Sequence, residues 1–368
     1  MDRLAQDAAL DILNIDPNTE HIRTRLHIPP ASGGFGISSA KITAPAAHAT
    51  SWARSLAKHA YPSTVLSNDS LTLEYLNQDI TQLTQLGIKN IINLDQLLET
   101  GKNNKQQSKW HKEALENKQT HIMDNTTDQL IFVINASSTP GAAAWTQPPK
   151  LPIHHMTNDE FITAARLRAG DTTHTEEKSC THHNDQGKCR TMEDVHGIHG
   201  LCCGRGGAAV KRHNAIVATL ALFIADLVTG PIYTEQVPIH DDMMDQKKPD
   251  ISYTDTSGIT RHIDVSICTP HPKQDGSTSG KPGHLAKTRE DTKMNKFSHL
   301  NLYPFVLEHL GRPGIHTRQY IRTLTKDLPI TTRSIKIQEI WQTTSTLLQK
   351  YNAMMVATAG TLKPIRRF

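Results

Sequence analysis

The sequence predicts a mixed α/β fold of the α+β kind, in which a mostly helical first part precedes a small mixed sheet flanked by helices. Apolar residues recur at helical spacing through much of the first 135 residues. After residue 214 the order changes to helix, strand, hairpin, helix and strand. A chain of 368 residues is long enough for two or three domains with separate cores.

The first region, 1–135, is expected to be a helical scaffold. Apolar residues at helical spacing predict helices over 42–60 and 68–87. The polar stretch 101–113 is expected to be exposed. No residue pattern in this region indicates a specific chemistry.

A segment rich in Pro, Ala and Ser at 136–152 predicts a linker and a domain boundary. The next region, 153–213, begins with a helix over 157–170 that Gly170 closes, because glycine readily adopts the left-handed conformation that ends helices. A window rich in cysteine and histidine follows at 180–203.

The region 214–330 is expected to be an α/β core, and 331–368 a helical tail. β-Branched and aromatic residues mark the strands, and polar clusters mark the turns between them. The elements expected in the core are a helix over 214–228, a strand over 232–237, a hairpin over 251–267, a helix over 284–300 and a strand over 301–310.

Composition limits the classes of function. The longest apolar run, 215–228, is too short to span a bilayer and contains Asp226, and the first residues do not read as a signal peptide, so we expect an intracellular protein that does not bind membranes. The net charge of +4 does not by itself indicate a nucleic-acid-binding protein. Basic residues are concentrated locally, however, where they could neutralise phosphates or form solvated faces, at 205–213, 281–296 and 312–333.

Four of the five cysteines lie in the window 180–203. Thiolates and imidazoles are the preferred tetrahedral ligands of zinc, and four protein ligands leave no open position. The spacing predicts a structural zinc site formed by Cys180, Cys189, His199 and Cys203. Competing ligands, and the alternative of free thiols in a polar loop, stay open; the competing residues are His182, His183, His196 and Cys202.

The predicted hairpin carries two aspartates. If its turn is centred on Ser257, Asp250 lies opposite Asp264, and cross-strand partners have Cβ atoms about 5 Å apart. Alternation would place Ser252 and Ser266 on the same face as the aspartates, with apolar residues on the other. Two facing carboxylates on an apolar layer can hold a divalent metal, as phosphodiester hydrolysis requires. The alternative is a solvated hairpin whose acids have no function.

Four groups of residues occur in order along the chain. They are Pro30-Ala31-Ser32-Gly33-Gly34-Phe35-Gly36-Ile37 with Ser51-Trp52-Ala53, Asp194-x-x-Gly197-x-His199-x-x-x-Cys203 with Arg212-His213-Asn214, Lys248-Pro249-Asp250 with Asp264-Val265-Ser266, and Lys293-x-x-Lys296-Phe297. Together they resemble the C-terminal region of non-LTR retrotransposon polyproteins that carry a restriction-like endonuclease. The likeness covers the post-reverse-transcriptase segment, a zinc knuckle and a PD-(D/E)XK nuclease.

The resemblance implies that Asp250 and Asp264 hold Mg²⁺, with Mn²⁺ as an alternative. The usual tripeptide would place a lysine at 266, where this chain has Ser266. In the resembled family the catalytic lysine has moved to the following helix, so Lys293 or Lys296 would take its role. The alternative for both lysines is an ordinary solvated basic face.

The resemblance also gives Glu235 an acidic position that could be a third metal-side carboxylate or a surface residue. The first cysteine of the knuckle is displaced relative to the family, which affects the assignment of Cys180. Phosphate contacts without sequence readout are expected from basic residues beside the two sites, namely Arg205, Lys211, Arg212 and Arg289.

The function that follows is nicking of target DNA to prime reverse transcription in the nucleus. The partners implied are DNA, an RNA template and a reverse transcriptase domain or chain. No catalytic polymerase motif is visible, so polymerisation by this chain is not expected. Whether the chain is an active enzyme stays open. The alternatives are a catalytically inactive zinc-containing nucleic-acid-binding module and a decayed retroelement fragment.

Overall fold

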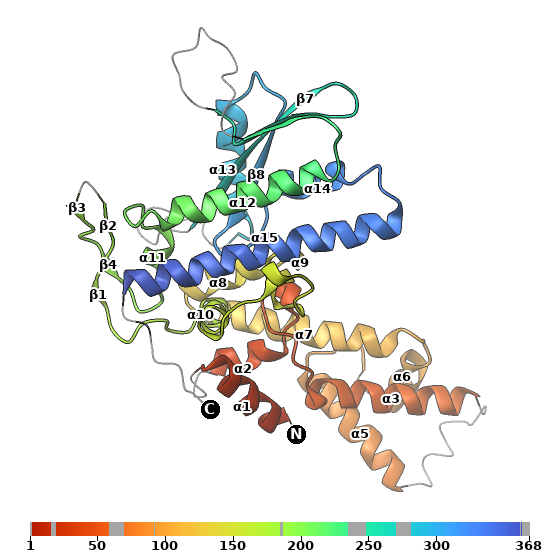
Figure 1. Cartoon of the computed structure of the whole chain (residues 1–368). Helices are drawn as coiled ribbons and strands as arrows, with labels where there is room; N and C mark the ends of the chain where they lie inside the picture. Colours follow the sequence, from red (N-terminus) through yellow and green to blue (C-terminus); the bar gives the residue numbers. More distant parts are fainter. Residues whose placement is uncertain are drawn as a thin grey trace. The chain divides into compact units, whose positions relative to one another are not determined.

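A computed structural model describes residues 2–15, 20–58, 70–91, 93–184, 187–234, 248–269, 281–360 and 362. Helices dominate, and the largest sheet of the described residues has four strands, so the coarse α+β class is confirmed (Figure 1). The chain forms two compact units. Unit 1 comprises Met1–Ile12, Pro17–Pro29 and Phe35–Thr126, and unit 2 comprises Leu13–Asp16, Pro30–Gly34 and Thr127–Phe368.

Unit 1 is helical, as expected for this region. The central helix α3 packs against α5, α6 and α7. The polar stretch 101–113 is not exposed throughout, because Trp110 of α7 is buried, with 2% of its surface accessible. The helices are α1 (Asp2–Leu13), α2 (Glu20–His27), α3 (Ala40–Lys58), α5 (Ser70–Gln85), α6 (Leu94–Gly101) and α7 (Gln106–Asp124).

The longest stretch of unit 2 begins at Thr127, ahead of the linker expected at 136–152. That segment is packed rather than extended, because its small residues allow close contact with the C-terminal helix: a Cβ on Gly141 would lie 3.3 Å from the Trp341 ring. Ala142 and Trp145 are buried there. The elements are α8 (Asp128–Ser137), α9 (Pro140–Ala143), the 3-10 turns η1 (Pro30–Ser32), η2 (Ala144–Thr146) and η3 (Pro152–His154), and α10 (Asn158–Ala169).

The helix expected over 157–170 is confirmed together with its ends. Thr157 and Glu160 form a reciprocal capping box at the start of α10. Gly170 closes the helix with φ of 71°, a conformation that costs a residue with a Cβ about 1 kcal/mol or more.

The cysteine- and histidine-rich window has little regular structure. Strand β1 (Lys178–Ser179) pairs with β4 (Met192–Glu193), and β2 (His183–Asn184) pairs with β3 (Gly187–Lys188). The short helix α11 (Ile198–Cys202) follows. Two strand pairs this short contribute little by themselves, so the segment depends on other contacts.

The core has the predicted order of helix, strand, hairpin, helix and strand. Strands β5, β6 and β7 are antiparallel neighbours, and β8 joins β7 in parallel through the crossover helix α13. Residues 235–237 of the first expected strand lie outside the described residues. The elements are α12 (Ala208–Ala225), β5 (Ile232–Thr234), β6 (Ile251–Thr254), β7 (Thr260–Cys268), α13 (His284–Lys296), β8 (Leu302–Glu308), α14 (Ile315–Leu324) and α15 (Ile330–Ala359).

The sheet has one apolar face and one polar face. Ile251, Tyr253, Ile263 and Val265 join a core with residues of α12, α14 and α15, as the alternation along the hairpin predicts. On the other side, α13 packs against β7 and β8 (Figure 1). The aspartates and serines of the hairpin therefore belong to the face that α13 approaches.

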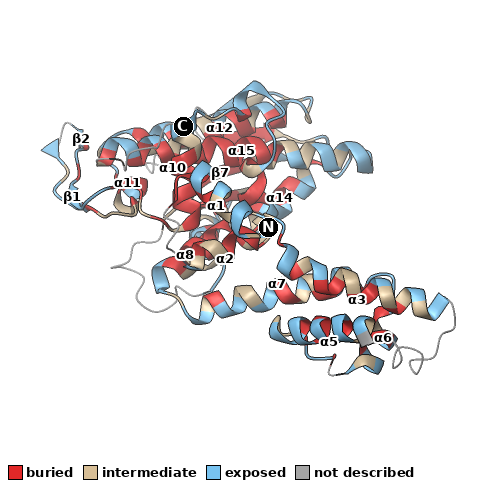
Figure 2. Ribbon diagram, turned by 90° about the horizontal axis from the view of Figure 1, so that it is seen from below, coloured by how far each residue is buried: buried red, intermediate tan, exposed pale blue. Residues whose placement is uncertain are grey.

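The expected C-terminal tail is a central helix of unit 2. Helix α15 has 30 residues and packs against α10, α11 and α12. Figure 2 shows buried residues along both α12 and α15. Many of the buried residues of α15 are polar, including Gln342, Gln349 and Asn352. The polar side chains of α15 are therefore compatible with a buried position in unit 2.

Helix α12 has 18 residues, and its length and composition would be sufficient to cross a membrane. This helix begins before the apolar run 215–228 and is longer than it. In the structure 44% of the helix is buried, and its apolar residues pack on the sheet and on α15, which is the environment of a core helix.

Candidate metal centres

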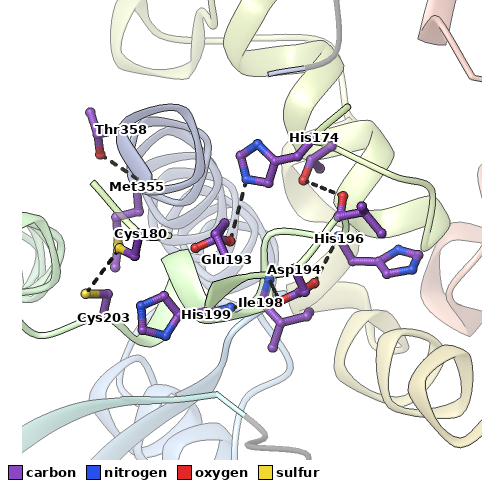
Figure 3. Close-up of polar contacts among 12 residues, drawn as sticks. His174, Cys180, Glu193, Asp194, His196, Ile198, His199, Cys203, Met355 and Thr358 are labelled. Atoms are coloured by element: carbon purple, nitrogen blue, oxygen red, sulfur yellow. Dashed lines mark hydrogen bonds and ion pairs between the residues drawn. The ribbon is translucent and has the colours of Figure 1, made fainter. Parts of the chain in front are cut away.

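Cys180, Cys189, His199 and Cys203 lie together, and we call them the Cys/His cluster. Their ligand atoms all lie within 4.8 Å of one another. The Sγ atoms of Cys180 and Cys203 are 3.9 Å apart (Figure 3). Cys189 Sγ is 3.4 Å from His199 Nε2. Zinc–sulfur bonds of about 2.3 Å in a tetrahedron place two sulfurs about 3.8 Å apart. The Cys/His cluster could therefore hold a metal ion such as zinc.

Backbone hydrogen bonds bring the donors of the cluster together. The N–H of Cys180 donates to Thr191 O, and that of Cys189 donates to His182 O. Asp194 caps α11 by accepting from the N–H groups of Ile198 and His199, at 3.0 and 3.2 Å (Figure 3). The motif around Asp194 is visible in the sequence, but its role in fixing the start of α11 is not.

The competing residues have other positions. The His182 ring is 2.9 Å from Thr358 Oγ1, and Cys202 Sγ donates to carbonyls of its own helix. His183 is exposed on β2. Among the described residues, neither these three nor His196 joins the four ligand atoms of the cluster.

The electrostatics of the cluster favour a cation. Burial raises the pKa of the Cys180 thiol to about 12 and also raises the pKa of Cys203. Although burial opposes it, hydrogen bonds from Thr191 lower the pKa of Cys189. Three thiols this close cannot all ionise without a positive charge between them, and a divalent metal ion supplies that charge.

The hairpin has the predicted register. Ile251 pairs with Ile263 and Thr254 with Thr260, which centres the turn on Ser257. Asp250 precedes β6 by one residue and therefore lies beside Asp264. The backbone N–H of Val265 donates to Asp250 Oδ2 at 2.5 Å, which fixes one oxygen of that carboxylate.

Lys293 of α13 forms an ion pair with Asp264 Oδ2. Asp264 is 4% exposed, and burial raises its pKa, with the nearby Asp250 carboxylate acting in the same direction and Lys293 opposing it. We call Asp250, Asp264 and Lys293 the carboxylate site. Its two carboxylates are hard, desolvated oxygen donors of the kind that Mg²⁺ and Mn²⁺ prefer, so the donor set fits a divalent cation.

A buried carboxylate fixes α13 one turn before Lys293. Glu290 is fully buried and accepts hydrogen bonds at 3.0 Å from the N–H groups of Ile315 and Thr317, at the start of α14. The contact requires Gly314, because a Cβ there would lie 2.0 Å from Glu290 Oε1. The contacts of Glu290 with α14 therefore hold α13 in place, and with it Lys293 beside the sheet.

The side chains of the two candidate lysines, Lys293 and Lys296, make different contacts. Lys293 reaches Asp264, whereas Lys296 Nζ lies 4.4 Å from the centre of the Phe297 ring. Arg289 donates from Nε to Ser266 Oγ at 2.8 Å, at the position where the usual motif has its lysine. The three basic residues share a helix face, as their spacing predicts, and Lys293 forms an ion pair with Asp264 of the site.

The start of α12 contributes two side chains. His213 Nε2 lies 3.3 Å from Asp250 Oδ1. Its neighbour Arg212 is 4% exposed and donates to Asn352 Oδ1 at 2.6 Å and to Leu201 O at 3.1 Å. The expectation that Arg212 contacts DNA is therefore wrong, because its guanidinium is buried and engaged inside unit 2.

The other expected phosphate contacts remain at the surface. Lys211 and Arg289 are exposed, and Arg205 donates to Asn184 Oδ1 and Gly187 O at 3.2 and 3.3 Å while staying partly accessible. The expected third carboxylate, Glu235, lies outside the described residues.

A scan against protein-family models finds no match, and a search of curated proteins finds no significant match. The two candidate metal centres are therefore the features of the chain that indicate a function. One could hold a structural metal ion with four protein ligands, and the other combines two carboxylates with a lysine.

Proposed function

We propose that unit 2 contains a metal-dependent DNA endonuclease of the PD-(D/E)XK class. The observation that carries the proposal is that Asp250, just before β6, Asp264 of β7 and Lys293 of α13 lie together. The order of a hairpin with both aspartates, a crossover helix with the lysine and a parallel strand is what the resemblance to restriction-like nucleases implies.

The residues of the site would divide the work of hydrolysis. Asp250 and Asp264 would hold a divalent cation, whose charge would polarise the scissile phosphate and lower the pKa of an attacking water. Lys293 places a positive charge beside the site, where it would orient that water and offset negative charge that develops on the phosphate. Val265 N–H holds Asp250 in place, so one metal-side carboxylate is ordered before the substrate binds.

Two further parts complete the proposal. The Cys/His cluster would hold zinc as a structural ion, since four protein ligands leave no position for a substrate. Lys211, Arg205 and Arg289 would contact phosphates without reading sequence. The biological role proposed is a nuclear one, in which the nick primes reverse transcription by a polymerase domain or partner chain on an RNA template.

The test is nicking of supercoiled plasmid by the zinc-loaded protein with Mg²⁺ or Mn²⁺. We expect nicking that disappears in an Asp250→Asn, Asp264→Asn double variant. The matched control is Asp291→Asn, which changes an exposed carboxylate of α13. Equal activity in the double variant would mean that the cut is made elsewhere or by a contaminant.

A catalytically inactive nucleic-acid-binding module is the second candidate. Ser266 favours it, because this position of the usual motif has lost its lysine and its hydroxyl is bound by Arg289. Such a protein would bind DNA or RNA with strong salt dependence and would not cut it. Binding without metal-dependent cleavage by a folded, zinc-loaded chain would establish this candidate over the first.

A further inference from the structure

Two neighbouring residues in the first turns of α12 connect the Cys/His cluster to the carboxylate site. Helix α12 begins after Gly207, and no side chain caps its first turn. Arg212 and His213 follow within its first two turns, and their side chains leave the helix about 100° apart. Arg212 contacts the segment of the cluster, and His213 contacts Asp250.

Arg212 is bound at the cluster by the carbonyl of Leu201, which lies in α11 between His199 and Cys203. Its second partner is Asn352 of α15, whose amide donates to His309 O. The buried guanidinium thus requires α11 to be folded and to present this carbonyl. If the cluster loses its metal ion, α11 loses the ligands at both of its ends, and the Arg212 contact is weakened.

His213 completes the positioning of Asp250. Among the described residues, the strand pairing of β6 begins at Ile251, so Asp250 lies just outside the described ladder. One carboxylate oxygen accepts from Val265 N–H, and the other lies beside the His213 ring. Two partners on opposite oxygens fix the rotation of a carboxylate, whereas one partner does not. Outer partners of metal ligands typically change metal affinity or activity by about 10- to 100-fold.

We propose that His213 is a positioning residue for Asp250 and that Arg212 makes its placement depend on the metal ion of the Cys/His cluster. The inference rests on the proposed nuclease function. It predicts that binding of zinc at the cluster strengthens binding of the divalent cation at the carboxylate site, although the two sites share no ligand.

The test measures Mn²⁺ binding to the zinc-loaded chain by calorimetry, with plasmid nicking recorded in parallel. In His213→Ala we expect the Mn²⁺ Kd to rise about 10- to 100-fold. His213→Gln, which keeps a donor at similar reach, should restore most of the affinity. Asn214→Ala is the matched control, because this neighbouring side chain is exposed. Zinc content is measured for every variant.

The second arm tests the dependence on zinc. Removal of zinc should weaken Mn²⁺ binding in the wild type. It should have little further effect in His213→Ala, because that variant already lacks the side chain that links α12 to Asp250. Arg212→Lys, which cannot reach both partners with one ammonium, should weaken Mn²⁺ binding with zinc still bound. This variant serves as the test if the zinc-free chain unfolds.

The outcomes separate this inference from the proposed function. Mn²⁺ binding that depends on Asp250 but is unchanged in His213→Ala would overturn the role of His213 and leave the nuclease in place. Unchanged Mn²⁺ affinity in Arg212→Lys, or equal losses on zinc removal in both backgrounds, would overturn the coupling. No Asp250-dependent binding of Mn²⁺ in the wild type would overturn the proposed nuclease itself, and the inference with it.

Discussion

The Cys/His cluster and the carboxylate site differ in how the chain assembles them. The cluster takes all four donors from one short segment, 180–203, and they lie within 4.8 Å of one another. The carboxylate site takes its residues from β7, α13 and the residue before β6, and the sheet brings them together. The first is a closed set suited to a structural ion. The second supplies two carboxylates, so a metal ion held there would have positions left for water and a phosphate, as the proposed hydrolysis requires.

The largest expected effect tests the cluster as a structural centre. In Cys203→Ser we expect loss of bound zinc and a lower melting temperature of unit 2, because a structural zinc ion stabilises the folded state that binds it. The measurements are zinc per chain by mass spectrometry and the melting curve. Cys202→Ser is the matched control, since that thiol is exposed and outside the cluster, and it should retain its zinc. Full zinc content in Cys203→Ser would contradict the ligand set.

The second prediction tests the assignment of the lysine. Lys293→Met should lower the nicking rate by about 100- to 1,000-fold, the usual effect of removing one group that stabilises the transition state. Lys296→Met should stay within about threefold, because Lys296 packs on Phe297. Both are measured as single-turnover rates at saturating Mg²⁺. The reverse ranking of the two variants would assign the role to Lys296.

The third prediction concerns Glu308, a carboxylate of the same sheet whose burial outweighs the opposing effect of the nearby Arg312 charge. Burial raises the pKa of Glu308 from 4.5 to about 7. Between these pH values the folded chain binds more protons than the unfolded chain, so the free energy of unfolding falls as pH rises, and the loss is complete above pH 7. Glu308→Gln should therefore stabilise the protein by about 3 kcal/mol at about pH 8 and by much less at about pH 5.

Urea unfolding of the zinc-loaded protein at the two pH values checks this. The control is Glu177→Gln, an exposed residue for which we expect no change. A stabilisation by Glu308→Gln that is the same at both pH values would show that packing, and not the charge, is responsible.

The smallest effect concerns Asp194, the cap of α11. Asp194→Ala should cost about 1 kcal/mol of helix capping, which lowers zinc affinity by about fivefold, because His199 is then less well ordered. Competition with a zinc chelator measures the change. Glu176→Ala, an exposed acid upstream of the cluster, should leave zinc affinity unchanged. No loss in Asp194→Ala would show that the cluster orders α11 by itself.

Sequence patterns correctly predicted the features that depend on residues close together in the chain. The alternation along the hairpin predicted its register and its apolar face, and Thr157 and Gly170 predicted both ends of a helix. The choice of four ligands from eight candidates also agrees with the structure. These features are determined by backbone geometry or by spacing within a short segment.

Features that depend on distant packing were not predicted. Arg212 reads as a basic surface residue, but the carbonyl of Leu201 and the amide of Asn352 hold it inside unit 2. The contact of His213 with Asp250 requires α12 to lie beside the hairpin. The small residues at 136–152 that suggest a flexible linker are small because α15 packs closely against them.

The most direct test of the nuclease is the chemistry of the DNA ends at the nick. Plasmid nicked by the zinc-loaded chain with Mg²⁺ is given to a DNA polymerase with a labelled nucleotide, beside plasmid treated with Asp264→Asn. Hydrolysis by water in a site of this kind should leave 3′-hydroxyl ends, which the polymerase extends directly, and the label should be absent with Asp264→Asn. Label that does not depend on Asp264, or nicks that need phosphatase before extension, would contradict the proposed function.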